Sequence, residues 1–525
     1  MSGLRITDWF EYTATTRPYL PFLSMQGRTL SYAQADLQAN QWAHALIAQG
    51  LAIGDRLGYL STNSMDMGVM LIAAAKAGVA PVMLNYRLAP PEWLAILRDS
   101  APGVLFVRGE AYVSAIDALA LPQELPGIRL VAIDCEAPAG WQTLAQYLEG
   151  HARTRPGRPV SADDMLYLIY TSGTTGLPKG VMISHNNVLM HIEQSMMASS
   201  ASKAPGERAL VTTPLYHAAG VHRIMNAAVT KGTVVLMEHF DGQEFVDTLE
   251  RERINTCNMV PAIMQSLLDD IPDIAQRDFS RLRVIYYGAA PVSVTLLQRA
   301  MQVFRCDLIQ GYGLTESSGG FVYLNEVDHA RALAGDEHLL RSTGRPVLAD
   351  VRIVDADGKD VPRGEPGELI VRGPNVMLGY WRNPEATAQA IKDGWLHSGD
   401  VASMDEEGYI YLRDRLKDMI VTGGTNVYPR EVENVLMAHA GIADVAVIGI
   451  PDVKWGEAIM AICVARGGQP PGDDELIAFC RERLGGFKVP RRYAFVDALP
   501  RNASGKVLKR ALREPYWAGA GRGIA

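Results

Sequence analysis

The sequence has few cysteines, and their arrangement excludes two classes of site. There are five in 525 residues, and no two of them stand in a C-x-x-C pair. This spacing argues against a cysteine zinc site, and the odd, scattered number argues against a disulfide framework. Both observations suit a reducing compartment, so we expect a cytoplasmic protein. The five are Cys135, Cys257, Cys306, Cys463 and Cys480.

Long hydrophobic runs are lacking as well. The most apolar stretch, residues 69–84, is interrupted by Lys76, Gly78 and Pro81. A membrane-spanning helix needs about 20 consecutive apolar residues, so we interpret this stretch as a buried helix that runs into a strand. The first residues, MSGLRITDWFEY, are charged where a signal peptide would be apolar. We therefore predict no integral membrane segment and no signal peptide.

The chain also lacks an excess of positive charge. It has 50 Lys and Arg against 58 Asp and Glu, a net charge of −8, and no Lys/Arg-rich block, which argues against a nucleic-acid partner. Hydrophobic residues make up 48% and charged residues 21%, as in ordinary globular proteins. Because 525 residues exceed what one hydrophobic core supports, two or more domains are expected.

Strand-like and helix-like segments alternate over roughly the first 340 residues, which predicts an α/β fold with largely parallel sheets. The segments are strand-like at 57–61, 81–85, 130–134, 233–237 and 282–288, and helix-like at 32–50 and 293–304.

The pattern changes after that point. Turn signals at Asp357-Gly358 and Pro366-Gly367 predict a small antiparallel β unit over 351–373. Residues 408–424 place charges between two strand-like segments and are interpreted as a linker. The rest of the chain predicts an independent α+β domain. It has helices at 431–439 and 473–484 and strands at 444–450 and 459–465.

One loop is rich in hydrogen-bond donors. YTSGTTGLPKG (170–180) holds four Ser and Thr hydroxyls, three glycines and Lys179, all suited to phosphate oxygens. It is not a P-loop, because Pro178 and Gly180 stand where that motif needs glycine and Ser or Thr. The alternative is a solvated turn. Its position between a strand-like run and a strand that leads into a helix favours a nucleotide phosphate site.

Further along, QGYGLTE (310–316) joins an aromatic ring to a hydroxyl and a carboxylate. Tyr312 is suited to stack on adenine, Thr315 to bond a phosphate and Glu316 to hold Mg²⁺. The alternative is an ordinary turn that leads into a capped helix.

Two later motifs carry one candidate residue each. LHSGD (396–400) ends in Asp400, whose carboxylate could accept hydrogen bonds from both ribose hydroxyls, although Ser-Gly-Asp is also a common turn. PRNASGKVLKR (500–510) places Lys506 in a segment too polar for a core, where a solvated charge is the alternative.

Together and in this order, the motifs resemble the adenylate-forming superfamily of acyl-CoA synthetases, peptide-synthetase adenylation domains and luciferases. The resemblance covers nearly the whole chain. It includes PLYHAAG (214–220), YYGAAP (286–291), GELIVRGPNVMLGYWRNPEAT (367–387) and DRLKDMIVTGGTNVYPREVE (414–433) besides the motifs above. It is nearest to bacterial fatty-acyl-CoA ligases and 4-coumarate- or ferulate-CoA ligases.

The resemblance implies a large N-terminal domain of two α/β subdomains plus a β subdomain, followed by a small mobile α+β domain. We place the AMP- and acyl-binding domain at 1–416 and the mobile domain at 417–525. It also implies two half-reactions, in which a carboxylate attacks ATP to give acyl-AMP and pyrophosphate, and a thiol then displaces AMP. ATP, Mg²⁺ and coenzyme A are the implied cofactor and co-substrates.

The family's residue roles carry over by motif position. The implied phosphate-binding residues are Thr171, Ser172, Gly173, Thr174, Thr175, Gly176 and Lys179. Thr171 and Glu316 are the implied magnesium ligands. Gly288, Ala289, Ala290, Gln310, Gly311 and Tyr312 would enclose adenine, with Thr315 near the α-phosphate and Asp400 and Arg415 on the ribose.

Four further positions concern catalysis and the conformational change. Lys506 would bridge the attacking carboxylate and the α-phosphate, and His217 would lie beside the acyl group. Lys417 falls at the family's hinge. Rotation there would bring residues 422–427, with Gly423 and Gly424, to the active site and open a thiol tunnel.

The identities of the acid substrate and of the thiol acceptor are what the sequence determines least. Val221 stands where some long-chain enzymes have a tryptophan gate, and SSGGF (317–321) is small, so an apolar fatty acid of medium or long chain or an aromatic acid fits better than acetate. No carrier domain follows in the sequence, which favours free coenzyme A.

Two rival readings stay open. One is an enzyme that loads a separate carrier protein or oxidises its acyl-AMP as luciferases do. The other is a non-catalytic acyl- or nucleotide-binding relative. A homodimer is also left open, since nothing in the sequence determines the oligomeric state.

Overall fold

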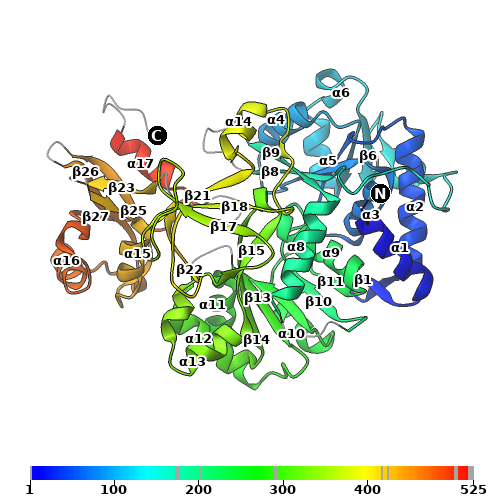
Figure 1. Cartoon of the computed structure of the whole chain (residues 1–525). Helices are drawn as coiled ribbons and strands as arrows, with labels where there is room; N and C mark the ends of the chain where they lie inside the picture. Colours follow the sequence, from blue (N-terminus) through cyan, green and yellow to red (C-terminus); the bar gives the residue numbers. More distant parts are fainter. Residues whose placement is uncertain are drawn as a thin grey trace. The chain divides into compact units, whose positions relative to one another are not determined.

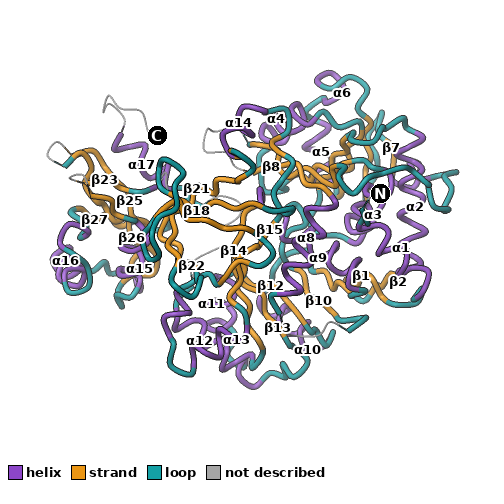
Figure 2. The backbone as a smooth tube through the Cα atoms, viewed as in Figure 1, coloured by secondary structure: helices purple, strands orange, loops and turns teal. Residues whose placement is uncertain are grey.

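The chain folds into two compact units, which are drawn in Figures 1 and 2. The first consists of Met1–Asp350 and Val371–Leu396, and the second of Val351–Ile370 and His397–Ala525. The predicted boundary between residues 416 and 417 stays a prediction. The computed structural model describes residues 3–171, 178–199, 204–288, 292–415, 418–422, 425–452, 455–501 and 507–517.

A nine-stranded sheet, sheet A, forms one half of the first unit. Its strand order is β16-β15-β14-β13-β12-β10-β11-β1-β2, parallel from β14 to β1 and antiparallel at both edges. The strands are β1 (Pro21–Met25), β2 (Arg28–Ser31), β10 (Arg208–Val211), β11 (Thr233–Leu236), β12 (Thr256–Met259), β13 (Val284–Gly288), β14 (Asp307–Leu314), β15 (Gly319–Leu324) and β16 (Arg345–Pro346).

An eight-stranded sheet, sheet B, forms the other half. Its order is β19-β9-β8-β4-β3-β5-β6-β7, and the strands from β8 to β7 are parallel. The strands are β3 (Arg56–Leu60), β4 (Ala80–Leu84), β5 (Val104–Arg108), β6 (Arg129–Ile133), β7 (Gln142–Thr143), β8 (Met165–Thr171), β9 (Lys179–Ser184) and β19 (Gly379–Tyr380). The short strand β20 (Ile391–Lys392) pairs with Trp395 and Leu396.

Helices α8 and α9 lie between the two sheets (Figure 1), with α8 against β9 and β15 and α9 against β10 and β11. The other helices pack around the sheets. The helices of this unit are α1 (Ile6–Thr16), α2 (Tyr32–Ala48), α3 (Met65–Ala77), α4 (Pro90–Ser100), α5 (Glu110–Asp117), α6 (Leu121–Glu124), α7 (Leu144–Leu148), α8 (His185–Met197), α9 (Ala218–Thr230), α10 (Gly242–Arg251), α11 (Pro261–Asp270), α12 (Val294–Phe304), α13 (Glu326–Leu333) and α14 (Pro384–Ala390), with 3₁₀ turns η1 (Ile274–Gln276), η2 (Thr315–Ser317) and η3 (Glu337–Arg341).

The second unit holds two smaller sheets. In one, β18 lies between β17 and β21, and β22 pairs with residues 400–404 of β21. The other has the order β24-β23-β26-β25, with β27 beside β26. Apolar clusters cover both faces of the long β25–β26 ladder. The elements are β17 (Asp350–Val354), β18 (Gly367–Arg372), β21 (Trp395–Met404), β22 (Ile410–Arg415), β23 (Ile420–Thr422), β24 (Thr425–Val427), β25 (Ile442–Asp452), β26 (Gly456–Ala465), β27 (Arg492–Phe495), α15 (Pro429–Met437), α16 (Asp473–Arg481), α17 (Lys509–Trp517), η5 (Arg466–Gly468) and η6 (Gly486–Lys488).

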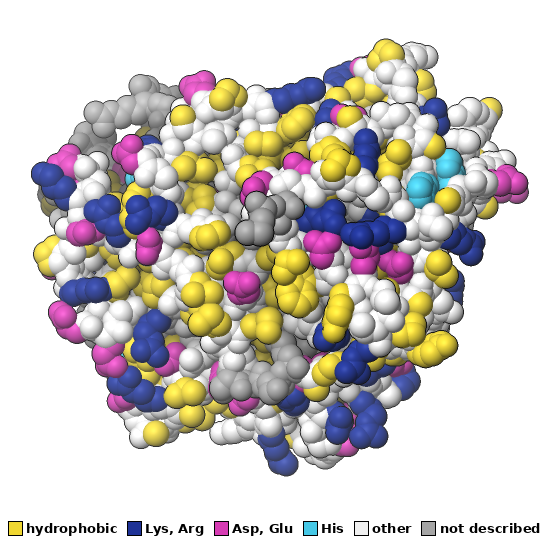
Figure 3. All heavy atoms as spheres, turned by 45° about the vertical axis from the view of Figure 1, so that its right-hand side comes forward, with side chains coloured by type: hydrophobic (Ala, Val, Ile, Leu, Met, Phe, Trp, Pro, Cys, Tyr) yellow, Lys and Arg dark blue, Asp and Glu magenta, His cyan; other side chains and the backbone are white. Residues whose placement is uncertain are grey.

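The predicted α/β class is confirmed, and so is the interpretation of residues 69–84 as a helix that runs into a strand. Helix α3 begins after Ser64, whose hydroxyl caps the backbone N–H of Met67, and ends at Gly78, which has a φ of 70°. Within the described residues, no helix is long and apolar enough to cross a membrane. On the face drawn in Figure 3, described Lys and Arg side chains are interspersed with Asp and Glu.

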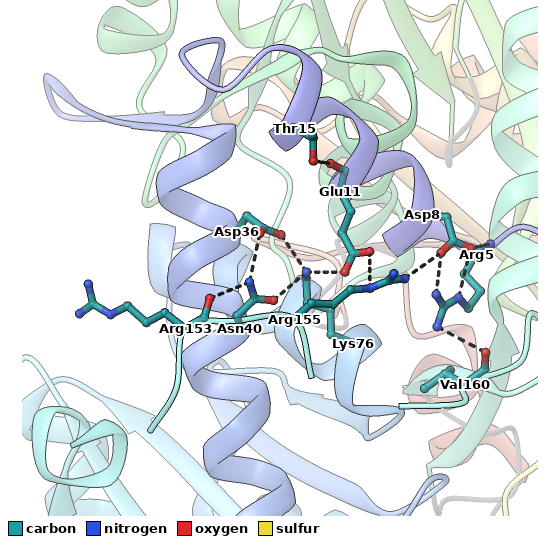
Figure 4. A network of polar contacts seen from close by, with 10 residues as sticks. All are labelled: Arg5, Asp8, Glu11, Thr15, Asp36, Asn40, Lys76, Arg153, Arg155 and Val160. Atoms are coloured by element: carbon teal, nitrogen blue, oxygen red, sulfur yellow. Dashed lines mark hydrogen bonds and ion pairs between the residues drawn. The ribbon is translucent and has the colours of Figure 1, made fainter. Parts of the chain in front are cut away.

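Lys76 is the one position in the apolar helix that composition alone misjudges. It is 4% exposed, yet its ammonium donates to Glu11 of α1 at 2.6 Å and to Asp36 and Asn40 of α2 at 2.7 and 2.8 Å. Figure 4 shows these side chains converging, with Arg155 pairing with Glu11 from the outer side. Lys76 thus joins three helices through a buried charge that has two counter-charges.

We expect Lys76→Met to destabilise the first unit by roughly 3 kcal/mol, because it leaves two carboxylates facing an apolar side chain. The matched control is Arg155→Met, which removes a 60% exposed cation from the same cluster and should cost less than about 1 kcal/mol. Thermal unfolding of both variants measures the difference. Equal melting temperatures would show that the Lys76 pairs contribute nothing net.

Candidate active site

The β8–β9 hairpin holds two of the predicted phosphate and metal residues next to each other. Thr171 ends β8, Lys179 begins β9, and the two are direct partners in the antiparallel ladder. The Thr171 hydroxyl donates to the Lys179 carbonyl at 3.5 Å. Lys179 directs its ammonium over the ring of Tyr380, 5.1 Å from the ring centroid.

Tyr380 contacts both Lys179 and Glu316, the residue whose carboxylate is predicted to bind magnesium. Its hydroxyl donates to Oε1 of Glu316 at 2.9 Å, and β19 places it opposite Val181 of β9. Burial first, and then the negative charge and hydrogen bond of Glu316, raise the pKa of the Tyr380 phenol. Tyr380 therefore stays protonated at neutral pH and acts as a donor. Lys179, Tyr380 and Glu316 form one cluster, called here the phosphate cluster.

Glu316 sits on a rigid turn. It is the middle residue of η2, and Ser317 closes this turn by accepting the backbone N–H of Leu314 at 2.9 Å. The Ser317 hydroxyl also lies 2.9 Å from the carbonyl of Gly319. The turn is followed by Ser318 with a φ of 54°. These bonds fix the backbone that carries Glu316.

The loop of residues 374–377 donates hydrogen bonds to the backbone of the turn η2. Met377 donates its N–H to the Glu316 carbonyl at 2.9 Å, and Asn375 donates to the Ser317 carbonyl at 3.3 Å. Asn187 of α8 in turn donates to the carbonyls of residues 374 and 376 at 2.7 and 2.8 Å. Tyr380, Asn375 and Asn187 are site residues that the sequence analysis missed. The only signal was the position of the first two in the family motif GPNVMLGYW.

Of the six predicted adenine-binding residues, the structure describes four: Gly288 ends β13, and Gln310, Gly311 and Tyr312 lie within the neighbouring strand β14. Gly288 lies opposite Gly311, and a Cβ at Gly288 would approach the Gly311 carbonyl oxygen to 2.4 Å, so glycine is required there. Gln310 is 9% exposed, and the Tyr287 hydroxyl lies 3.4 Å from its Oε1. Tyr312 contacts Phe321 edge-on, with 5.6 Å between the ring centroids.

The predicted ribose-binding residues are neighbours in the second unit. Asp400 of β21 is 6% exposed and lies opposite Arg415 of β22 in the antiparallel ladder. Glu368 supports the turn before Asp400. It accepts the Gly399 N–H at 3.1 Å and pairs with His397 Nδ1 at 2.7 Å.

The other predicted residues divide into two groups. Thr315 begins η2, beside Glu316. The remainder lie outside the described residues, so their roles stay predictions. They are Ser172, Gly173, Thr174, Thr175, Gly176, Ala289, Ala290, Lys417, Gly423, Gly424 and Lys506.

On the acyl side, His217 is the N-cap residue of α9, with its ring 4.4 Å from that of Tyr216. The next turn of α9 is packed more tightly than its small residues suggest. Val221 is fully buried, and His191 of α8 occupies the space beside Gly319, where a Cβ would meet its ring at 2.8 Å. A tryptophan at residue 221 would thus overpack the interior.

This interior is also polar. His222 of α9 is 4% exposed, makes a 2.5 Å hydrogen bond to the Tyr167 hydroxyl and lies 4.5 Å, ring to ring, from His191. Burial, followed by the charges of His191 and Arg223, lowers the pKa of His222 well below its usual value. His222 is therefore neutral at physiological pH.

The donor set fits a magnesium–nucleotide complex. Among the described residues, no three His, Cys, Asp or Glu side chains are grouped so that they could hold a metal ion by themselves. Mg²⁺ usually takes one or two carboxylates together with substrate phosphates. One carboxylate, Glu316, with the Thr171 hydroxyl and the Lys179 ammonium nearby matches that requirement.

Comparison with known proteins decides the family. The AMP-binding enzyme family matches residues 10–381, and the AMP-binding enzyme C-terminal domain matches residues 431–506. The chain belongs to the AMP-binding enzymes. It is an adenylate-forming, ATP-dependent acid–thiol ligase with a large N-terminal AMP-binding domain and a small C-terminal domain. Coenzyme A is the co-substrate of the family's acyl-CoA ligases.

Individual relatives match nearly the whole chain but are named for different substrates. A fatty acid–[acyl-carrier-protein] ligase, ScoC of Streptomyces coeruleorubidus, is 36% identical over 98% of this chain and 96% of its own. A feruloyl-CoA synthase of Amycolatopsis is 38% identical over 98% and 100%. The o-succinylbenzoate coenzyme A synthetase of Bacillus subtilis, solved with ATP and a magnesium ion, is 28% identical with a TM-score of 0.83, over 96% and 98%.

Proposed function

We propose that this AMP-binding enzyme activates a largely apolar carboxylic acid, a fatty acid of medium or long chain or an aromatic acid, and transfers it to free coenzyme A. The phosphate cluster is the observation that carries the proposal. It brings a cation, a neutral donor and a carboxylate to one place, although the three lie far apart in the sequence.

In the first half-reaction, Lys179 and the Thr171 hydroxyl bind the β- and γ-phosphates. Glu316 and Thr171 hold the magnesium ion, which shields the phosphate charge when bound. The carboxylate oxygen of the acid attacks the α-phosphorus, and the bond to the pyrophosphate oxygen breaks. Both reactants are anions, so the reaction needs fixed positive charge where negative charge develops. Lys506 provides that charge.

In the second half-reaction, the thiol of coenzyme A attacks the acyl carbon and AMP leaves. Asp400 and Arg415 hold the ribose in place during adenylation. Lys417 is the hinge about which residues 417–525 rotate, which removes Lys506 and brings Gly423 and Gly424 toward the thiol path. His217 lies at the start of α9, beside the acyl group.

The relatives support either thiol, since one is named for an acyl-carrier protein and another for coenzyme A. The purified protein is therefore assayed with ATP, Mg²⁺ and an acid panel, once with coenzyme A and once with a phosphopantetheinylated carrier protein. We expect acid-dependent pyrophosphate release and acyl-CoA detectable by mass spectrometry. Formation of acylated carrier protein without acyl-CoA would favour the alternative of an enzyme that loads a carrier protein. The absence of pyrophosphate release with every acid would favour a binding-only protein.

The acid panel tests the apolar preference. Each buried methylene contributes about 0.8 kcal/mol, roughly fourfold in affinity, so kcat/KM should rise from acetate to octanoate or a cinnamate. Acetate turned over as well as octanoate would contradict the proposed substrate class.

A further inference from the structure

Arg223 of α9 is a half-buried cation that faces an aromatic ring instead of a carboxylate. Its guanidinium carbon lies 4.6 Å above the ring centroid of Tyr286 in β13. No carboxylate pairs with it among the described residues, in contrast to Lys76, which has two. Burial lowers the pKa of Arg223, although the phenols of Tyr286 and Tyr323 act in the opposite direction. An arginine stays charged even so, and a ligand that displaced the remaining solvent around it without supplying a counter-charge would leave that charge unpaired.

A small cavity lies against this guanidinium. Its volume is about 30 Å³, space for roughly two water molecules, which is also the size of a carboxylate group. One stripe of α9, with Arg223, Asn226 and Thr230, forms one wall, and Tyr286 belongs to another. Glu207 also borders the cavity, and its charge is paired with Arg283 through Oε1, which also accepts the N–H of Ala204.

The cavity lies away from the predicted adenine-binding end of β13, because it borders Thr233 and Thr256, the first residues of β11 and β12. Tyr286 precedes Gly288 by two residues on β13, so both face the same side of sheet A about 7 Å apart. Arg223 follows His217 by six residues, about 9 Å along the axis of α9. A group that reaches Arg223 therefore belongs to the end of the acid remote from its reacting carboxyl.

We propose that Arg223 binds a second, distal carboxylate of the acid, and that the preferred substrates are dicarboxylic acids with an apolar or aromatic stem. This deepens the proposed function and rests on it for the position of the reacting carboxyl. A fatty-acid methyl group at this place would leave the guanidinium desolvated and unpaired, whereas a carboxylate supplies both the charge and the hydrogen-bond acceptors.

Matched pairs of acids test the subsite. Pyrophosphate release is measured with octanoate against suberate and with cinnamate against 4-carboxycinnamate. We expect the dicarboxylic member of each pair to have a kcat/KM roughly tenfold to a hundredfold higher, as for hydrogen bonds to charged groups. Arg223→Met, which keeps the apolar stem, should abolish this preference, and Arg223→Lys should retain part of it. Arg251→Met removes a 54% exposed arginine and should change nothing.

Each outcome decides for or against the subsite. A wild-type preference for the monocarboxylic member overturns it, whether or not the variants fold. An Arg223→Met variant whose kcat/KM falls equally for both acids of a pair also overturns it. The same pairs are also titrated calorimetrically onto wild-type protein. A diacid that binds tighter but releases no pyrophosphate would overturn the ligase proposal and leave the subsite standing.

Discussion

Replacing Lys506 with alanine is expected to lower acid-dependent pyrophosphate release roughly 100-fold to 1,000-fold, the usual cost of removing one group that stabilises a developing charge. Conversion of supplied acyl-AMP to acyl-CoA should continue near the wild-type rate. The reason is that the ammonium is needed only while two anions approach each other. Once acyl-AMP exists, the proposed rotation about Lys417 takes Lys506 away from the site, so the attack of the thiol on the carbonyl carbon does not use its ammonium.

The residues on either side of Lys506 make contacts that do not involve its side chain, so the substitution tests the ammonium itself. Val507 pairs with Arg501 in an antiparallel bridge, Arg501 pairs with Asp444 at 2.5 Å, and Lys509 pairs with Glu433 at 2.8 Å. The ends of the segment are thus anchored independently of residue 506. Arg510→Ala, at a 57% exposed position, is the matched control and should leave both half-reactions unchanged. Equal loss of both half-reactions in Lys506→Ala would refute the assigned role.

The fold could be predicted where local patterns determine structure. The strand predicted at 81–85 is β4 one residue earlier, and the helix predicted at 293–304 is α12, begun by the Ser293 cap. Lys76 shows where such reasoning ends. In the sequence it interrupts an apolar run, but in the structure it is buried, because α1 and α2 bring carboxylates to it from 65 and 40 residues away. Composition does not contain that proximity.

The same distinction holds for the candidate site. Lys179 and Glu316 could be identified from motifs, because their chemistry is visible in a few neighbouring residues. Tyr380 could not be given a role, because its contact with both depends on β19 pairing with β9. Arg223 was visible as a charge in α9, but only the packed structure shows that the charge has no partner among the described residues.

Glu316→Gln should lower pyrophosphate release at saturating acid by roughly 100-fold, because the amide keeps the shape of the side chain but loses the charge that binds the magnesium ion. Raising the Mg²⁺ concentration should recover part of the rate, since weaker binding can be overcome by mass action. The apparent affinity for Mg²⁺, measured at fixed ATP, is therefore the quantity that separates a metal ligand from a residue that only supports the turn η2.

Tyr380→Phe provides the contrast within the same cluster. It removes one hydrogen bond to the Glu316 carboxylate but leaves the ring under the Lys179 ammonium, so a loss of roughly tenfold is expected. That loss should appear mainly in the KM for magnesium-ATP, because Tyr380 positions Glu316 and touches no reacting atom. If Glu316→Gln were no worse than Tyr380→Phe and insensitive to Mg²⁺, the carboxylate would be structural, and the metal would have to be held by ATP and the 172–177 loop instead.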